Sequence, residues 1–418
     1  MLLYIDPGTG SMLFTILIGL ITTLFFLFQK LTVKMRFLLH GGNVKVQENQ
    51  NKIPLLIFSE GKQYWVIFKP VCDELERRGV DTVFWTADEN DPAISTEYQH
   101  IHTEFIGEGN KAFAKLNMAN ADVLLATTPG LDVFQWKRSK NVRWYVHILH
   151  SVDDSTSYRM FGLDHYDAVL MSGQYQIDEQ RELEKLRNLP SKKMLVVGST
   201  YLDTMKARKE NEQSDEAVSG DKQKTILLAP SWGDSSILCR WGDRILTALK
   251  ETGYTVIVRP HPQSFVSDKS VIEPLMNKYQ EKDGFFWNRD KDNFDCLKKA
   301  DIMITDFSSI MYDYTLVFDK PLIYADTKFD ISPYDAAWLD EEPWKFQVLP
   351  KLGHVLREED FPHMKKLIDE ISDSEEFAAG REEARQHVWQ HIGQAAQLTA
   401  DYLLTCMNRS AASENAAE

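Results

Sequence analysis

Short hydrophobic runs alternate with amphipathic stretches along the chain from Ile53 onward. The first runs, rich in β-branched and aromatic residues, span 54–59, 81–86, 101–106, 122–126, 143–147, 168–172 and 194–197. Between them, hydrophobic residues recur at helical spacing in stretches such as 64–78, 110–117 and 175–188. Strands that alternate with helices are typical of a parallel sheet with crossover helices, so this half of the chain predicts an α/β domain.

A polar stretch then interrupts the pattern. Residues 206–224, KARKENEQSDEAVSGDKQK, contain a single valine among charged and small residues, which predicts an exposed linker; a solvated helix is the alternative for its first half. The alternation restarts with candidate strands at 225–229, 255–258, 285–287, 302–305 and 321–325 and candidate helices at 236–251 and 292–299.

The restart predicts a second α/β domain. We therefore expect two doubly wound, Rossmann-like domains that face each other across a cleft. The expected parts are a first Rossmann-like domain at 52–205, the linker at 206–224, a second Rossmann-like domain at 225–375, a C-terminal helix at 376–407 and a disordered tail at 408–418.

The N-terminus carries a different signal. Residues 12–28, MLFTILIGLITTLFFLF, lack any charge and reach the short end of the length that spans a bilayer. Lys30, Lys34 and Arg36 follow the run, and by the positive-inside rule they place the rest of the chain in the cytoplasm. We expect residues 1–39 to form a single-pass anchor in the bacterial inner (cytoplasmic) membrane; a hydrophobic hairpin or core helix is the alternative.

The composition of the chain excludes some classes of protein and favours others. The chain has 418 residues, of which 43% are hydrophobic and 26% charged, and this suits two globular domains. Its net charge of −15 argues against nucleic-acid binding, which needs a basic face. The four cysteines lack the spacing of a zinc site or a disulfide framework and indicate reduced thiols of a cytosolic body.

Candidate chemistry gathers where the predicted strands end. The segments ILHSVDDS, APSWGDSS, VRPHPQ and TDFSS each follow a strand, and ligands of open α/β sheets lie at these carboxyl ends. His150, in the first segment, precedes Asp153 and Asp154; a carboxylate there would orient it and raise its basicity, as a general base requires. The acidic pair could instead bind a metal, but no further ligand accompanies it at suitable spacing.

The VRPHPQ segment favours a rigid histidine. Pro260 and Pro262 restrict the backbone on both sides of His261 and fix the direction of its imidazole. Arg259 adjoins it and offers a fork suited to phosphate. The alternative is a histidine whose hydrogen bonds are satisfied by the backbone of a rigid turn.

The stretch ITDFSSIMYDY joins a predicted strand to a helix that should begin near Ser308 or Ser309. A serine at that point either caps the helix or belongs to an anion site, because the N–H groups at a helix start point at whatever lies there.

Taken together, RPHP, ITDFSSIMYDY and LLAPSW resemble segments of the CDP-glycerol glycerophosphotransferases, GT-B-like enzymes that move glycerol phosphate from CDP-glycerol onto a lipid-linked or polymeric acceptor. The resemblance covers about residues 143–325. It implies a donor resembling CDP-glycerol and an envelope glycan or lipid-linked acceptor, with no cofactor and no metal.

The resemblance also implies roles for single residues. His150 would be the catalytic base and His261 a catalytic group that stabilises the transferring phosphate. The donor-binding residues would be Arg259, Asp306, Ser308, Ser309, Asp313 and Ser231. The family's WHGTPLK is LHSVDDS in this chain, which leaves the acceptor and the donor open. Two further hypotheses therefore stand: a GT-B glycosyltransferase that uses a sugar nucleotide, and an inactive envelope scaffold.

Overall fold

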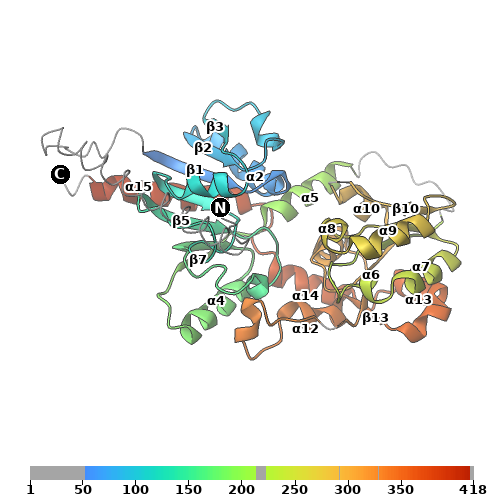
Figure 1. The fold of residues 1–418 in the computed structure, drawn as a ribbon. Coiled ribbons are helices and arrows are strands. Elements are labelled where there is room, and N and C mark those ends of the chain that lie inside the picture. Colours follow the sequence, from blue (N-terminus) through green and yellow to red (C-terminus); the bar gives the residue numbers. More distant parts are fainter. Residues whose placement is uncertain (1–51, 213–222, 291, 328, 415–418) are drawn as a thin grey trace, which may run out of the picture. The chain divides into compact units, whose positions relative to one another are not determined.

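Two parallel β-sheets organise the protein, as the sequence predicts. The computed structural model describes residues 52–212, 223–290, 292–327 and 329–414 (Figure 1). The first sheet has seven strands in the order β3-β2-β1-β4-β5-β6-β7, and the second has six in the order β10-β9-β8-β11-β12-β13. In each sheet the strand order reverses beside the first strand, which is the doubly wound topology that places ligands at the carboxyl ends of the strands.

The N-terminal sheet contains β1 (Ile53–Ser59), β2 (Thr82–Thr86), β3 (Ile101–Phe105), β4 (Ala121–Ala126), β5 (Val142–Ile148), β6 (Ala168–Met171) and β7 (Lys193–Val196). Its helices are α2 (Trp65–Arg77), α3 (Asn110–Leu116), α4 (Gln174–Leu186) and α5 (Thr200–Glu212), with short η1 (Lys62–Tyr64), η2 (Pro92–Ile94) and η3 (Ser155–Ser157). Alternate residues of β1 point to opposite faces, so that Leu55 and Ile57 join one hydrophobic cluster while Leu56 and Phe58 join another. Both faces are therefore covered, as a parallel sheet requires.

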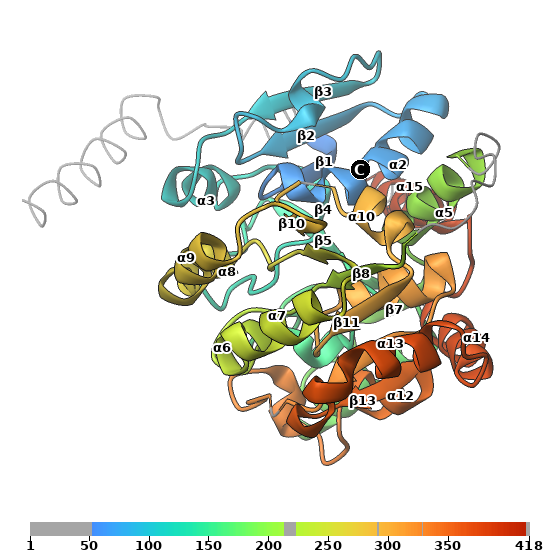
Figure 2. The ribbon, with the colours of Figure 1, turned by 90° about the vertical axis from the view of Figure 1, so that its right-hand side faces the viewer.

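The C-terminal sheet contains β8 (Thr225–Leu228), β9 (Thr255–Val258), β10 (Phe285–Trp287), β11 (Ile302–Thr305), β12 (Leu322–Ala325) and β13 (Gly353–Leu356). Its helices are α6 (Ile237–Arg240), α7 (Gly242–Glu251), α8 (Ser264–Ser267), α9 (Lys269–Lys278), α10 (Phe294–Lys299), α11 (Ile310–Tyr312), π-helical η5 (Asp313–Phe318), η6 (Asp335–Trp338), α12 (Trp344–Leu352), η7 (Glu358–His363) and α13 (Met364–Ser372). Helices α7 and α13 cover one face of this sheet (Figure 2).

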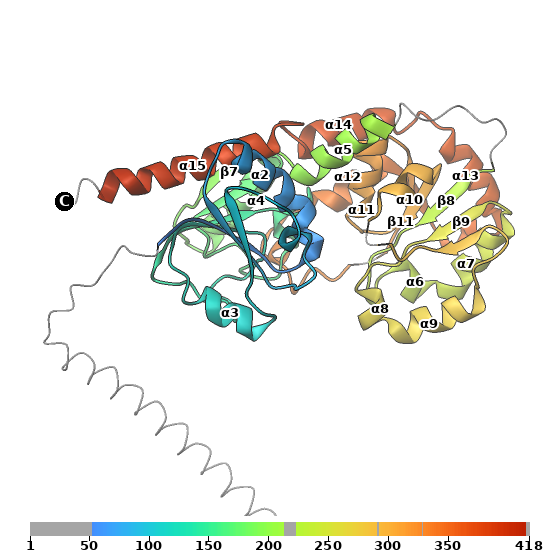
Figure 3. The same cartoon turned by 90° about the horizontal axis from the view of Figure 1, so that it is seen from above.

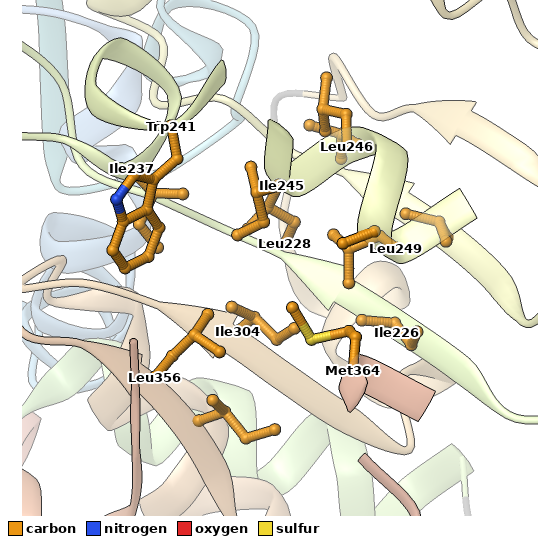
Figure 4. Close-up of a cluster of buried hydrophobic side chains, with 14 of the residues drawn as sticks. Ile226, Leu228, Ile237, Trp241, Ile245, Leu246, Leu249, Ile304, Leu356 and Met364 are labelled. Carbon is orange, nitrogen blue, oxygen red and sulfur yellow. The ribbon is translucent and has the colours of Figure 1, made fainter. Parts of the chain in front are cut away.

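The core on that face shows how hydrophobic spacing becomes packing. Ile226 and Leu228 of β8 lie two residues apart and point to the same side, where they meet Ile245 and Leu249 of α7 (Figure 4). These four side chains are fully buried, and each such burial is worth roughly 1.5–3 kcal/mol. The hydrophobic layer fixes the sheet, and the sheet in turn fixes the loops at its carboxyl edge.

The last part of the chain departs from the prediction. The expected helix at 376–407 is two helices, α14 (Ala378–Val388) and α15 (Ala395–Glu414). The Asp203 carboxylate accepts hydrogen bonds from the N–H groups of Gly393, at 2.8 Å, and Ala395, at 3.1 Å, so it caps α15 where the chain restarts. Helix α15 also reaches Glu414, which overturns the prediction of a disordered tail from residue 408.

Helix α15 returns to the N-terminal sheet. It runs beside α2 and covers the same face of the sheet (Figure 3). Leu403 is buried there among residues of β1 and β4, and Trp144 of β5 donates an indole hydrogen bond to the Tyr402 hydroxyl at 3.2 Å. The first domain is therefore completed by the end of the chain.

The structure differs from the predicted elements in three smaller respects. Helix α5 extends to Glu212 and takes up the first residues of the predicted linker at 206–224. The predicted helix at 236–251 divides into α6 and α7 at Gly242, whose φ of 36° interrupts regular helix. Strand β13 was not predicted; it begins at Gly353, where a Cβ would lie 1.8 Å from the Leu322 carbonyl oxygen.

The predicted anchor at 1–39 lies outside the described residues. Within the part of the chain that the structure describes, no helix has the length and apolar character needed to cross a membrane.

Candidate functional site

A cavity of about 750 Å³ lies at the carboxyl ends of both sheets. Its walls come from the loops that follow β5, β8, β9 and β11 and from the segment between β12 and α12. The predicted site residues that line it are His150, Ser231, Arg259, His261, Ser308, Ser309 and Asp313. Seven of the eight predicted residues, which are up to 163 positions apart in sequence, thus share one cavity.

His150 follows the end of β5 on the N-terminal side of the cavity. Its Nδ1 lies 3.0 Å from the Tyr158 hydroxyl, and its ring packs at 5.6 Å between centroids against Tyr64. Burial lowers the pKa of His150 below its ordinary value, although Asp153 acts in the opposite direction. A neutral imidazole is the form that a general base needs, so this burial suits the predicted role.

Asp153 raises the pKa of His150 as predicted, but it does not orient the ring, whose hydrogen-bond partner is Tyr158. Asp153 instead pairs with the Lys345 ammonium at 2.7 Å, and the same carboxylate accepts a hydrogen bond from the Ser309 hydroxyl at 2.6 Å. Asp154 accepts hydrogen bonds from the N–H groups of Trp344, at 2.6 Å, and Lys345, at 3.1 Å, at the start of α12. The acidic pair therefore ties the N-terminal domain to the C-terminal domain.

Lys345 and Tyr158 are site residues that sequence reasoning missed. Lys345 is buried in the cavity wall, and its pKa lies above the ordinary value because Asp153 and Asp154 outweigh the lowering effect of burial. Lys345 lies 192 residues from Asp153 in the sequence, so no local spacing of residues could predict that the two pair. Tyr158 carries no motif around it, and only the fold places its hydroxyl beside His150.

His261 lies on the opposite side of the cavity, after β9. Its Nδ1 accepts the backbone N–H of Gln263 at 3.1 Å. A backbone N–H can only donate, so in the neutral ring the proton must sit on Nε2. Burial, then Arg259, lowers the pKa of His261. The ring therefore presents an N–H donor, which suits the predicted contact with phosphate oxygens.

Arg259 and Ser231 complete the wall beside His261. The Arg259 guanidinium donates hydrogen bonds to the Asn288 side chain and, at 3.0 Å, to the Asp290 carbonyl, which fixes its direction. Trp232, 41% exposed, faces His261 with 6.4 Å between ring centroids. A guanidinium, an imidazole N–H and an aromatic face together suit a phosphate joined to a flat, ring-shaped group.

The segment with Ser308 and Ser309 turns into a helix, but neither serine caps it through its side chain. Ser309 stands at the N-cap of α11, yet its hydroxyl bonds to Asp153 and not to the helix. The helix soon widens into the π-helical η5, a form that is frequent at functional sites. Ser309 and Ile310 precede the first hydrogen-bonded turn, so their N–H groups lie at the start of the helix beside the cavity.

Asp306 and Asp313 have different environments. Asp306 is fully buried and does not line the cavity; it accepts hydrogen bonds from the N–H groups of Ser231 (2.8 Å), Ile237 (3.0 Å) and Ser308 (3.2 Å). The prediction of Asp306 as a donor-binding residue is thus corrected, because its carboxylate is taken up in joining the loops after β8 and β11. A carboxylate would in any case repel phosphate.

Asp313 lines the cavity and receives hydrogen bonds from the Tyr201 hydroxyl and the Asn293 amide, both at 2.9 Å. Burial raises the pKa of Asp313 to about 7, against these two hydrogen bonds, which lower it. At neutral pH it is therefore about half protonated, and it exerts less repulsion on a phosphate than an ordinary aspartate would.

No group of three or more His, Cys, Asp or Glu side chains in the described ranges is placed to hold a metal ion.

Comparison with known proteins agrees with this geometry. The profile of the family described as CDP-Glycerol:Poly(glycerophosphate) glycerophosphotransferase matches residues 157–393, which is more than half of the chain. The protein belongs to this family of glycerophosphotransferases, and it is an enzyme of the transferase class with a GT-B-like fold. The match includes Arg259, His261 and the two serines, whereas His150 lies ahead of it.

Solved structures share the fold at low identity. The wall teichoic acid polymerase TagF is 15% identical, with a TM-score of 0.59, over 92% of this chain and 98% of that one. A variant of TagF soaked with CDPG is also 15% identical, with a TM-score of 0.57, over 88% and 92% of the two chains. UDP-GlcNAc 2-epimerase from Neisseria meningitidis, bound to UDP-GlcNAc, is 13% identical with a TM-score of 0.55, over 84% and 99%. No curated protein matches the chain.

Proposed function

We propose that this protein transfers glycerol phosphate, or a related polyol phosphate, from a CDP-activated donor to an envelope glycan or lipid-linked acceptor. One observation carries the proposal: two histidines that follow strands of opposite sheets line the same cavity. Burial lowers the pKa of His150, and a backbone N–H bonded to Nδ1 leaves the hydrogen of neutral His261 on Nε2. Membership of the family and the fold shared with the CDPG-soaked TagF variant support the choice of donor.

The proposed reaction is an in-line displacement at phosphorus. The acceptor hydroxyl loses its proton to His150 while its oxygen attacks the phosphorus that bears the glycerol. The bond from that phosphorus to the bridging oxygen breaks, and CMP leaves with the electron pair. Because a phosphate leaves readily without being protonated, the site needs a base but no general acid.

The donor half of the cavity would stabilise the charge. The His261 N–H and the Arg259 guanidinium would bind the diphosphate oxygens, together with the hydroxyls of Ser231 and Ser308 and the N–H groups at the start of α11. Phosphoryl transfer depends mainly on positioning and electrostatic stabilisation, which is what this arrangement of donors provides.

The assay that tests the proposal compares leaving groups. Full-length protein is incubated with radiolabelled CDP-glycerol, CDP-ribitol and UDP-sugars in the presence of membrane-derived acceptor. Release of CMP with transfer of label from a CDP-polyol supports the proposal. Release of UDP from a UDP-sugar would identify a glycosyltransferase. Failure to turn over or bind any of the donors would indicate the inactive scaffold.

We further propose that residues 1–39 anchor this enzyme in the bacterial cytoplasmic membrane, with the catalytic body on the cytoplasmic side. The support is the uncharged run at 12–28 and the basic residues that follow it. Deletion of residues 1–39 should move the protein from the membrane fraction to the supernatant. A full-length protein that is extracted by plain buffer would contradict the anchor.

A further inference from the structure

Behind His150, two more aromatic side chains extend a row of hydrogen bonds into the core. The Tyr158 hydroxyl oxygen lies 3.0 Å from His150 Nδ1 and 3.3 Å from His147 Nε2. His147 belongs to β5 and is fully buried, and its ring packs at 5.5 Å between centroids against Tyr158. Neither Tyr158 nor His147 belongs to the catalytic roles described above, yet together they determine the hydrogen-bond partner of His150.

Counting protons distinguishes two arrangements of this row. A tyrosine hydroxyl has one hydrogen, so it can donate to one imidazole and accept from the other. If Tyr158 donates to His147 Nε2, its oxygen accepts a hydrogen from His150 Nδ1, and His150 Nε2 keeps a lone pair. Neutral His147 then carries its own hydrogen on Nδ1, which is buried without a hydrogen-bond partner in the described residues. If Tyr158 donates to His150 Nδ1, the proton of neutral His150 sits on Nε2, and Nε2 cannot act as a base.

The reaction itself favours the first arrangement. Once His150 has taken a proton, both of its ring nitrogens carry hydrogen, so Nδ1 needs an acceptor. The Tyr158 oxygen can accept only if its own hydrogen has gone elsewhere, and His147 Nε2 lies within reach to receive it. In this arrangement His150 changes charge without any rearrangement of the hydrogen bonds behind it.

We propose that Tyr158 is a positioning residue that accepts the Nδ1 hydrogen of His150, gives its own hydrogen to His147, and so keeps His150 Nε2 available as the base. This inference rests on the proposed function for its catalytic meaning. Tyr158 takes the place that a carboxylate would occupy beside a catalytic histidine, and it does so without adding negative charge.

Because Tyr158 is a neutral partner, it affects the pH range in which His150 can act as a base. The titratable groups that face His150 are Tyr64 from η1, His147 from β5, Tyr158 and Asp153 from the loop after β5. Burial also lowers the pKa of His147 and raises that of Tyr158, so both stay neutral near pH 7. Only Asp153 favours the charged form of His150, and it is shared with Lys345. The base should therefore remain active somewhat below its ordinary pKa of about 6.5.

The decisive variant is Tyr158→Phe in the full-length protein, with Tyr64→Phe as the matched control. Both changes remove one hydroxyl and keep a ring packed against His150. Tyr158→Phe should lower kcat by about 10- to 100-fold, by analogy with the loss of hydrogen-bond partners behind metal-binding histidines. It should leave the KM for CDP-glycerol unchanged. Tyr64→Phe should keep the wild-type kcat.

Nitrogen NMR of histidine-labelled protein gives a second readout that needs no substrate. His150 signals, assigned by their loss in His150→Ala, should show hydrogen on Nδ1 in the wild type and a mixture of tautomers in Tyr158→Phe. If the wild type releases no CMP from CDP-glycerol, the proposed function fails, while the tautomer is still measured on the resting protein. Wild-type kcat together with an unchanged His150 spectrum in Tyr158→Phe would overturn the inference.

A second pair of variants keeps the test decisive if Tyr158→Phe does not fold. His147→Gln retains an acceptor near the position of Nε2, whereas His147→Leu removes it. The inference expects His147→Leu to lower kcat and to mix the His150 tautomers, and His147→Gln to restore both toward the wild type. Equal kcat and equal spectra for the two variants would contradict the role of His147.

Discussion

The two histidine loops of the cavity are held in place in opposite ways. His261 is fixed by its own neighbours in the chain, with a proline on each side and a hydrogen bond from the backbone two residues on. His150 is contacted by Tyr64 from η1 and by Tyr158, eight residues on in its own loop. The acidic residues that follow His150 are bound to α12 of the other domain. One loop is built locally and the other by tertiary contacts.

The two histidine loops also differ in how they relate to the family profile. The family profile covers the His261 loop and the segment with both serines, and it begins after His150. A locally determined loop keeps its geometry whatever surrounds it, whereas a loop held by distant partners can change with them. The acidic pair Asp153 and Asp154 illustrates the second case, because both carboxylates are committed to the C-terminal domain and neither bonds to His150.

The largest expected effect comes from removing either imidazole. His150→Ala and His261→Ala should each lower kcat by about 10²–10⁴-fold, the range of general acid–base groups. The two should differ in binding: His150→Ala keeps the affinity for CDP-glycerol measured by calorimetry, and His261→Ala weakens it. Losses in the double variant should be far from multiplicative if one transition state uses both groups.

A His150→Ala variant that transfers at the wild-type rate would remove His150 from the mechanism. The cavity would then have only its donor half assigned.

The tie between the domains can be broken at Asp153. Asp153→Asn removes the carboxylate that pairs directly with the buried Lys345 ammonium and leaves only Asp154 to offset its charge. The loss of one member of a buried pair typically costs about 3–5 kcal/mol in the free energy of unfolding. Glu383→Gln is the matched control, because it breaks an exposed pair with Lys351 and should cost roughly 0–1 kcal/mol. Urea unfolding measures both.

Adding Lys345→Met to Asp153→Asn should recover part of the loss, since the buried ammonium that lost its direct partner is then removed. Equal stability of Asp153→Asn and Glu383→Gln would show that the Asp153 bridge does not hold the His150 loop.

The pH dependence of the free energy of unfolding tests the environment of Asp313, on the side of the cavity that would bind the donor. Asp313 has a folded pKa of about 7, far above its unfolded value of about 3.8, so the folded protein holds this proton more tightly. The stabilisation is present at low pH and is lost as pH rises through about 7, because ionisation is disfavoured only in the folded state. The Asp313→Asn variant has no carboxylate at this position and does not show this loss. The free energy of unfolding of the variant minus that of the wild type should therefore increase between about pH 4 and 7 and stay constant above about pH 7.

Unfolding in urea at several pH values gives this difference. Asp330→Asn serves as the control: Asp330 is exposed and its pKa is lowered, so the variant should show no such increase between pH 5 and 8. A flat difference for Asp313→Asn as well would mean that Asp313 ionises normally.

The smallest effect is expected from replacing one of the prolines that flank His261. Pro262→Ala should lower the free energy of unfolding by about 0.4–1 kcal/mol, mainly because the unfolded chain gains conformations. The Gln263 N–H still bonds to His261 Nδ1 in this variant, so kcat should change far less than in Tyr158→Phe. A loss of kcat as large as that of His261→Ala would show that the proline, and not the hydrogen bond, holds the imidazole.

Much of the molecule could be predicted from the sequence because its signals are local. Hydrophobic runs of strand length predicted all strands except β13, which is short and begins with glycine. The strand ends and the family resemblance together predicted seven residues of the cavity. Lys345 and Tyr158 could not be found in this way, since each acquires its role from a partner that only the fold brings near. Asp306 was misassigned because a buried loop-bonding carboxylate and a ligand-facing one look alike in sequence.

The return of α15 to the first sheet affects the order in which the protein can form on the ribosome. The strands of the N-terminal sheet are synthesised early, but Ala400, Leu403 and Cys406, which cover one of its faces, are made last. Until they emerge, the part of that face which α2 does not cover stays exposed while the whole second domain is translated. In this interval chaperones or self-association can compete for it. A premature stop near residue 390 would thus damage the domain encoded farthest from it.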